Sequence, residues 1–166
     1  MTPRKSRGAV TGRAELEYVY RETTFLNVDV DVLSATPLEP LAEALGRTVA
    51  VHYVGREGRH YGAHFSLYNP GTPDRAVRTL TALIENFPKP ARGCWNRARQ
   101  RVFNIGVQAG VEPRSHETLI SVAAVEAISR IGGSLTFTIY AADVAAASVP
   151  LVRAPRRKKT VRRTRP

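Results

Sequence analysis

The chain has 166 residues, 43% of them apolar and 23% charged, with a formal net charge of +11; this balance fits one globular domain and excludes a two-domain enzyme. The lone cysteine, Cys94, excludes a disulfide framework and a cysteine-based zinc site, so we expect a reducing, cytoplasmic compartment. No apolar run reaches the roughly 18 residues that span a bilayer, and the start of the chain lacks the apolar segment of a secretion signal. We therefore expect no membrane partner.

The positive charge is concentrated at the two ends of the chain. Residues 1–13 carry four basic side chains and residues 153–166 carry eight, with no acid in either segment. The residues between these segments include 13 basic and 14 acidic side chains, which leaves the middle of the chain close to neutral. Like-charged runs bury too little apolar surface to offset the entropy of ordering them. We predict a single domain at residues 24–141, with disordered basic arms at residues 1–23 and 142–166.

The first predicted element is a strand from Phe25, because apolar and polar residues alternate there with a period of two. The alternating residues are Leu26, Asn27, Val28, Asp29, Val30, Asp31 and Val32. A short helix follows, in which Thr36 and Glu39 have the spacing of a capping box and Gly46 ends the apolar stripe. Next comes a predicted hairpin of two strands, residues 48–54 and 59–68, joined through a turn with glycine at both shoulders.

The rest of the domain is predicted to alternate helices and strands. In order, we expect a core helix at residues 76–87, a basic helix at 90–100, a strand at 102–108, a helix at 121–131 and a strand at 135–139. The series begins with the βαββαβ order of ferredoxin-like folds and adds one helix and one strand. The predicted fold is therefore an α+β two-layer sandwich, with helices on one face of a mixed or antiparallel sheet. A doubly wound sheet fits less well, because it requires strands and helices to alternate along the chain and the predicted hairpin places two strands in succession.

The register of the predicted hairpin decides which side chains share a face of the sheet. Pairing residues whose numbers sum to an even value such as 114 gathers the apolar side chains on one face: Val49, Val51, Tyr53, Tyr61, Ala63, Phe65 and Leu67. His52, His60 and His64 then lie on the opposite face, and a ferredoxin-like order brings Asp29 and Asp31 beside them. Such a set is typical of a zinc site or of a general base with its orienting acid. The alternatives are a solvated sheet face and a ligand-binding face.

Other motifs give little support to an activity. Residues 59–66 partly match the base-stacking signature of RNA-recognition motifs, but the even register turns Tyr61 and Phe65 into the core. Phosphate-loop, dinucleotide and common hydrolase motifs are absent from the sequence, and we predict no cofactor. Cys94 is either a nucleophile activated by nearby arginines or a packed side chain beside Trp95.

Residues 89–101 carry five cations and no acid. On a helix, Arg92, Trp95 and Arg99 would face one way and form a phosphate-contacting surface with an aromatic anchor. The alternative is a solvated helix with Trp95 in the core. Together with the C-terminal arm, this segment provides the predicted nucleic-acid contacts: Arg92, Arg99, Arg153, Arg156, Arg157, Lys158, Lys159, Arg162, Arg163 and Arg165.

Four parts of the chain between residues 25 and 140 form a further pattern: residues 83–88, Trp95 with residues 101–106, Gly110, and residues 131–140. Together they resemble a family of small uncharacterised bacterial proteins. The resemblance implies an opening alternating strand and a glycine-terminated helix that leads into the closing strand. It implies no activity and no catalytic residue.

These observations lead to three interpretations of function. The first is a non-enzymatic binding module whose basic arms contact DNA or RNA without sequence specificity. The second is a protein-binding accessory or immunity-type protein. The third is a metal-dependent enzyme that uses His52, His60 and His64. Arginine outnumbers lysine 21 to 4, which is typical of a GC-rich bacterial genome.

Overall fold

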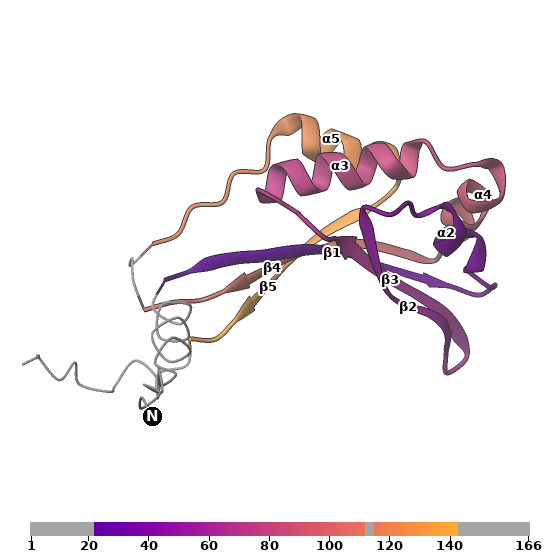
Figure 1. Ribbon diagram of the computed structural model, residues 1–166, viewed down its shortest axis with the longest axis horizontal. Helices are drawn as coiled ribbons and strands as arrows, with labels where there is room; N and C mark the ends of the chain where they lie inside the picture. Colours follow the sequence, from indigo (N-terminus) through magenta and orange to yellow (C-terminus); the bar gives the residue numbers. More distant parts are fainter. Residues whose placement is uncertain (1–21, 112–114, 143–166) are drawn as a thin grey trace, which may run out of the picture.

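Five strands form one mixed sheet in the computed structural model of the protein, which describes residues 22–111 and 115–142 (Figure 1). The strands are β1 (Thr24–Ser34), β2 (Val49–Glu57), β3 (His60–Leu67), β4 (Gln100–Gln108) and β5 (Ser134–Tyr140). Their order across the sheet is β2-β3-β1-β4-β5. Neighbouring strands are antiparallel except β4 and β5, which are parallel. The alternating strand β1 therefore lies at the centre, and β2 and β5 form the two edges.

The helices in the described part of the chain are α2 (Glu39–Ala44), α3 (Pro73–Glu85), α4 (Lys89–Arg97) and α5 (Val122–Arg130). They lie on one face of the sheet, and no described helix covers the other face, which we call the open face (Figure 1). The predicted α+β class, with helices on one face of a mixed sheet, is confirmed. The strand order differs from that of a four-stranded ferredoxin-like sheet, because the crossover through α5 adds a parallel strand outside β4.

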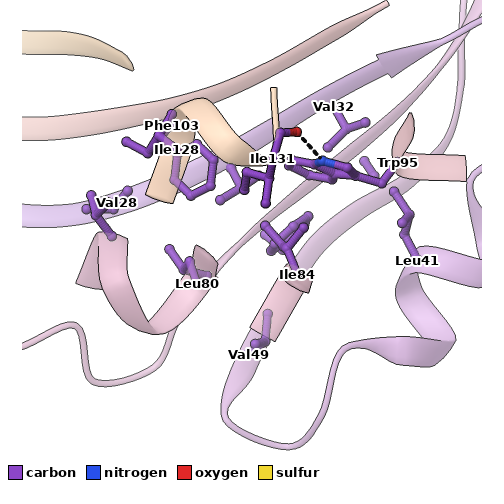
Figure 2. Packing of buried hydrophobic residues seen from close by; sticks show 14 of the residues in the cluster. Val28, Val32, Leu41, Val49, Leu80, Ile84, Trp95, Phe103, Ile128 and Ile131 are labelled. Atoms are coloured by element: carbon purple, nitrogen blue, oxygen red, sulfur yellow. Dashed lines mark hydrogen bonds between the residues drawn. The ribbon is translucent and has the colours of Figure 1, made fainter. Parts of the chain in front are cut away.

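The core lies between the helices and the sheet (Figure 2). The apolar residues of β1 that face the helices are almost completely buried, as the alternation predicted: Val28, Val30 and Val32. Trp95 on α4 is fully buried, and its indole Nε1 donates a 2.8 Å hydrogen bond to the carbonyl of Ile131. Its ring packs edge-to-face against Phe87 and Phe103, with both centroid distances at 6.5 Å. Of the two interpretations of Trp95, the core residue is therefore confirmed and the aromatic anchor of a phosphate-contacting surface is wrong.

The short helix α2 begins differently from the prediction. Its N-cap is Leu38, which has no side-chain hydrogen bond to the helix, so the capping box of Thr36 and Glu39 is wrong. The backbone N–H of Thr36 instead donates to Ser34 Oγ at 3.1 Å. Thr36 precedes Pro37, and this neighbour disfavours helical backbone at residue 36. The side chain of Leu38 is buried in the core.

The β2–β3 hairpin turns through two residues, Gly58 and Arg59, and Gly58 has the positive φ of +59° that favours glycine there. Val51 pairs with Phe65, an even sum, but Tyr53 pairs with His64, an odd sum. The register shifts between these pairs, which leaves one extra residue in β2 and forms a β-bulge. The predicted even register therefore holds only for the part of the hairpin far from the turn. Near the turn it is wrong, and Tyr53 lies on the open face beside His64, with ring centroids 5.8 Å apart.

The remaining elements fall close to their predicted positions. Helix α3 is capped by Thr72, whose Oγ1 accepts from the N–H of Arg75 at 3.3 Å. Helix α5 is capped by Ser121, as predicted, and Gly132 follows its end with a φ of +68°. In the described ranges, no helix is both long and apolar enough to cross a membrane. The predicted basic segments at residues 1–13 and 153–166 lie outside the described residues.

Candidate functional site

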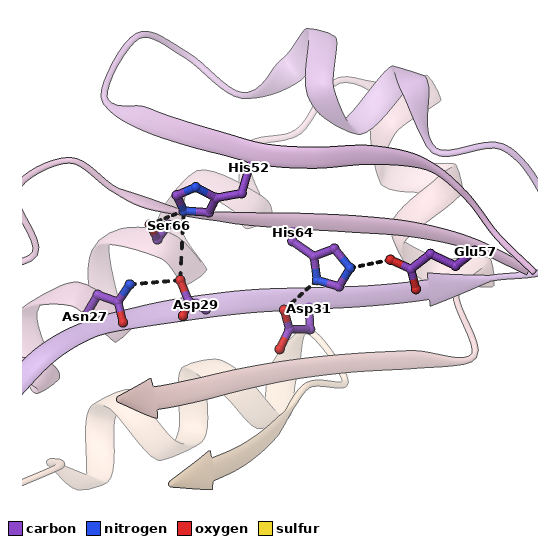
Figure 3. Close-up of polar contacts among 7 residues, drawn as sticks. All are labelled: Asn27, Asp29, Asp31, His52, Glu57, His64 and Ser66. Carbon is purple, nitrogen blue, oxygen red and sulfur yellow. Dashed lines mark hydrogen bonds and ion pairs between the residues drawn. The ribbon is translucent and has the colours of Figure 1, made fainter. Parts of the chain in front are cut away.

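The open face of the sheet carries a histidine held between two carboxylates (Figure 3). His64 on β3 lies with Nδ1 2.7 Å from Asp31 Oδ1 and Nε2 2.5 Å from Glu57 Oε1. Asp31 is the residue opposite His64 on β1, so the strand pairing itself brings the two together. Glu57 reaches His64 from the turn end of β2 across Gly62, where any Cβ would overlap the Glu57 carboxylate. Glycine at position 62 therefore makes room for this contact.

His64 can satisfy both carboxylates only in its protonated form, because a neutral imidazole has a single N–H to donate. Burial alone would lower the pKa of His64, but the hydrogen bonds with Asp31 and Glu57 raise it above its ordinary value. The protonated ring then ties β3 to β1 on one side and to β2 on the other. The cluster of His64, Asp31 and Glu57 is thus a polar link across three strands.

A second polar group lies on the same face, at the bulge of β2. His52 Nε2 is 2.8 Å from Ser66 Oγ and 4.0 Å from Asp29 Oδ1, and Asp29 also accepts from Asn27 Nδ2 at 3.0 Å (Figure 3). Burial raises the pKa of Asp29, and the nearby charge of Asp31 raises it further.

The second group does not have the geometry of a catalytic triad. In a triad, the serine and the carboxylate contact different nitrogens of the histidine ring. Here Ser66 and Asp29 both face Nε2 of His52, and Ser66 is only 4% exposed. A buried hydroxyl of this kind is not accessible to a substrate, so the group holds β2, β3 and β1 together instead of forming a nucleophile.

The structure places the predicted metal ligands His52, His60 and His64 in three different environments. His52 contacts Ser66, and His64 contacts Asp31 and Glu57. His60 Nδ1 is buried and has no hydrogen-bond partner within the described ranges. Across residues 22–111 and 115–142, no three His, Cys, Asp or Glu side chains come together in a way that could hold a metal ion.

The predicted surface of Arg92, Trp95 and Arg99 does not form. Arg92 is half-buried, and its guanidinium donates to the carbonyl of Glu85 at the end of α3. Trp95 lies in the core, and α4 ends at Arg97, so Arg99 lies in the connection to β4. The backbone N–H of Arg99 donates to the carbonyl of Leu33 at 2.8 Å, while its side chain is exposed. The three residues therefore share no helix face.

Sequence reasoning missed Glu57 as a member of the open-face cluster. The sequence places Glu57 in a turn, because Gly55 and Gly58 stand at the two ends of residues 55–58. A two-residue turn at Gly58 and Arg59 would have extended β2 to Glu57 and paired it with His60. The signal that could have found Glu57 was therefore the length of the turn.

Charge is distributed unevenly between the two faces of the domain. The open face carries Asp29, Asp31 and Glu57, and no outward position of the described strands on this face holds a lysine or arginine. On the helix side, a groove of about 670 Å³ lies between α3 and α5, and its charged lining is mixed: Arg75, Arg78, Arg130, Glu85 and Glu126. A polyanion would therefore be repelled more strongly by the open face than by this groove.

No family model, curated protein or solved structure matches the chain. The resemblance of residues 25–140 to a family of small bacterial proteins stays a prediction.

Proposed function

We propose that the protein is a non-enzymatic binding protein that contacts DNA or RNA through its basic ends. The observation that carries this proposal is the separation of charge along the chain. Four basic side chains in residues 1–13 and eight in residues 153–166 have no acid among them, whereas the rest of the chain is nearly neutral. Cations that neutralise phosphates release counterions, so binding of this kind is sequence-tolerant and strongly weakened by salt.

The surface of the domain supports an orientation for this binding. The carboxylates of the open face disfavour phosphates there, whereas the groove on the helix side is lined by Arg75, Arg78 and Arg130 together with Glu85 and Glu126. Two of these arginines already face acids, since Arg78 is 3.8 Å from Asp74 and Arg130 is 3.1 Å from Glu85. The helix side is therefore a secondary contact, and the ends of the chain provide most of the binding.

The test compares the full chain with two variants of residues 153–166. In one variant all eight cations become glutamine, and in the other the same residues are placed in scrambled order, which keeps composition and charge. Fluorescence anisotropy with a short duplex DNA and a single-stranded RNA at rising salt measures the slope of log affinity against log salt. On duplex DNA, each phosphate contact contributes about −0.9 to this slope. The slope of the glutamine variant is therefore expected to be less steep than that of the full chain, by as much as about 7 if all eight cations contact phosphates.

The scrambled variant is expected to bind like the natural sequence, because the interaction depends on charge. An unchanged affinity and slope in the glutamine variant would contradict the proposal. Loss of binding in the scrambled variant would show that residues 153–166 are recognised as a specific sequence, which also contradicts it.

A second candidate function, binding of a protein partner by the domain, is favoured by the exposed apolar residues along β5 and α5.

We also propose that the ferredoxin-like description applies to the region from β1 to β4, supported by the antiparallel pairings of those four strands. We further propose that the protein is cytoplasmic and bacterial. The lone cysteine supports the cytoplasmic location, and the excess of arginine over lysine supports the bacterial origin.

A further inference from the structure

The outer edge of β5 has no strand beside it among the described residues. Sheets usually protect such an edge with charges, proline, a bulge or a covering segment, because unpaired backbone N–H and C=O groups attract another strand. The seven residues of β5, SLTFTIY, contain no charge, proline or glycine, and their pairing with β4 is regular. Strand β5 therefore lacks the usual sequence protection of an edge.

Apolar side chains extend along the helix-facing side of the same edge. Phe137 and Ile139 pair with Ile105 and Val107, which are buried under the helices, yet they are themselves 49% and 69% exposed. On α5, Val122 is 74% exposed and Val125 is 50% exposed. Together Phe137, Ile139, Val122 and Val125 form what we call the β5 strip. A hollow of about 400 Å³ between α5 and β5 is lined by Val125 and adjoins this strip.

We propose that the β5 edge pairs with the β5 edge of a second copy of this chain, antiparallel and around a two-fold axis. A two-fold interface brings the same surface patch together twice, so the patch must be compatible with itself. An uncharged strand opposes its own copy without placing like charges across from each other. The paired strands satisfy each other's backbone groups, and each β5 strip covers the other.

The size of the strip fits such an interface. Each of its four residues is about half exposed or more, and a standard interface buries roughly 800 Å² per partner, so the strand backbone and Tyr140 contribute to the interface beside the strip. Tyr140 is 50% exposed at the end of β5.

The alternative occupant of the β5 edge is the remainder of this chain outside the described residues. That arrangement would leave the protein monomeric in the experiment below.

Sedimentation equilibrium of the full chain, without nucleic acid, tests the proposal. The natural sequence is expected to form a dimer whose population rises with concentration. Ile139→Lys and Val122→Lys, one on the strand and one on an exposed helix position, are each expected to weaken the dimer at least tenfold. The matched control is Val51→Lys, because Val51 is 43% exposed on the opposite edge strand β2.

The control is expected to leave the dimer unchanged, and circular dichroism checks that each variant folds. A full chain that stays monomeric at all concentrations would overturn the proposal. So would a dimer that both lysine variants on the β5 side preserve, or one that Val51→Lys weakens as strongly as they do. Because no nucleic acid is present, these outcomes are separate from the salt-dependence experiment on residues 153–166.

Discussion

The two edges of the sheet differ in how they treat a neighbouring strand. At one edge, β2 contains a bulge and two charged residues, Arg56 and Glu57, and Glu57 is held against His64 by a hydrogen bond. At the other edge, β5 is uncharged, regularly paired with β4, and flanked by exposed apolar side chains. The bulge and charges make β2 a poor template for another chain, whereas β5 keeps the properties of an interior strand. The same sheet therefore has one edge, β2, that is protected against pairing and one edge, β5, that is suited to it.

The first prediction concerns the core that joins the two halves of the sheet. Trp95→Ala removes a fully buried ring that packs against Phe103 on β4 and binds the carbonyl of Ile131 just before β5. Truncation of a buried aromatic side chain is expected to lower the free energy of unfolding by about 3–5 kcal/mol. Urea denaturation followed by circular dichroism measures this loss. Trp95→Phe, which loses the hydrogen bond but keeps an aromatic ring, is expected to lose less, and an equal loss in both variants would contradict this account.

The second prediction compares one glycine near each edge. A Cβ at Gly133 would lie 3.0 Å from both Ile128 Cγ2 and Phe103 Cε2 in the core. A Cβ at Gly55 would meet the Tyr53 hydroxyl, the end of an exposed and movable side chain. Gly133→Ala is therefore expected to destabilise the fold by about 1–3 kcal/mol, and Gly55→Ala by less than about 0.5 kcal/mol. Thermal unfolding of the two variants checks the order, and the reverse order would show that the β2 side is the more tightly packed.

The third prediction concerns the polar link of His64, Asp31 and Glu57, which includes a residue of the protected edge strand β2. Because the folded-state pKa of His64 is raised, its stabilisation is fully present below the unfolded-state pKa of about 6.5 and is lost as the pH rises through the folded-state value. With His64 about one-third exposed, solvent screening limits the effect to about 0.5–1 kcal/mol. Urea denaturation across this pH range is expected to show the loss in the natural sequence and not in His64→Gln. A pH dependence that persists unchanged in His64→Gln would assign the effect to another group.

The smallest expected effect belongs to Asp29, beside the bulge of β2. Burial and the neighbouring Asp31 raise its pKa, so ionisation of Asp29 destabilises the folded state as the pH rises through its folded-state value. Asp29→Asn removes this charge and is expected to stabilise the protein at neutral pH by about 0.5 kcal/mol or less. The same substitution below pH 3.8, where the carboxyl is largely protonated in both states, is expected to have no such effect. Destabilisation at neutral pH would mean that the contact with His52 outweighs the repulsion.

The sequence predicted the elements whose burial follows a simple period. β1 alternates because one side faces the helices, and α5 carries both its capping serine and its closing glycine. The bulge at His52 could not be predicted from alternation, because it depends on how the turn and the far end of the hairpin each fix their own register. For the same reason, the pairing of Tyr53 with His64 was missed.

The site was harder to predict than the fold, because its contacts depend on where elements end and on which helix side packs against the sheet. Helix α4 ends at Arg97, three residues before the predicted end, which removes Arg99 from its surface. Trp95 then points into the core, and Arg92 contacts a carbonyl at the end of α3. The early end of α4 thus removes Arg99, whereas the tertiary packing of the helix against the sheet decides the positions of Trp95 and Arg92.

The difference between the two edges is tested most directly by hydrogen exchange, measured by NMR on the full chain at low and high protein concentration. Outward-facing backbone amides of β5 are expected to exchange quickly when the protein is dilute and at least tenfold more slowly when it is concentrated. Those of β2 are expected to exchange at the same rate in both samples. Equal exchange of the β5 amides at the two concentrations, or protection that develops along β2 instead, would contradict pairing through β5.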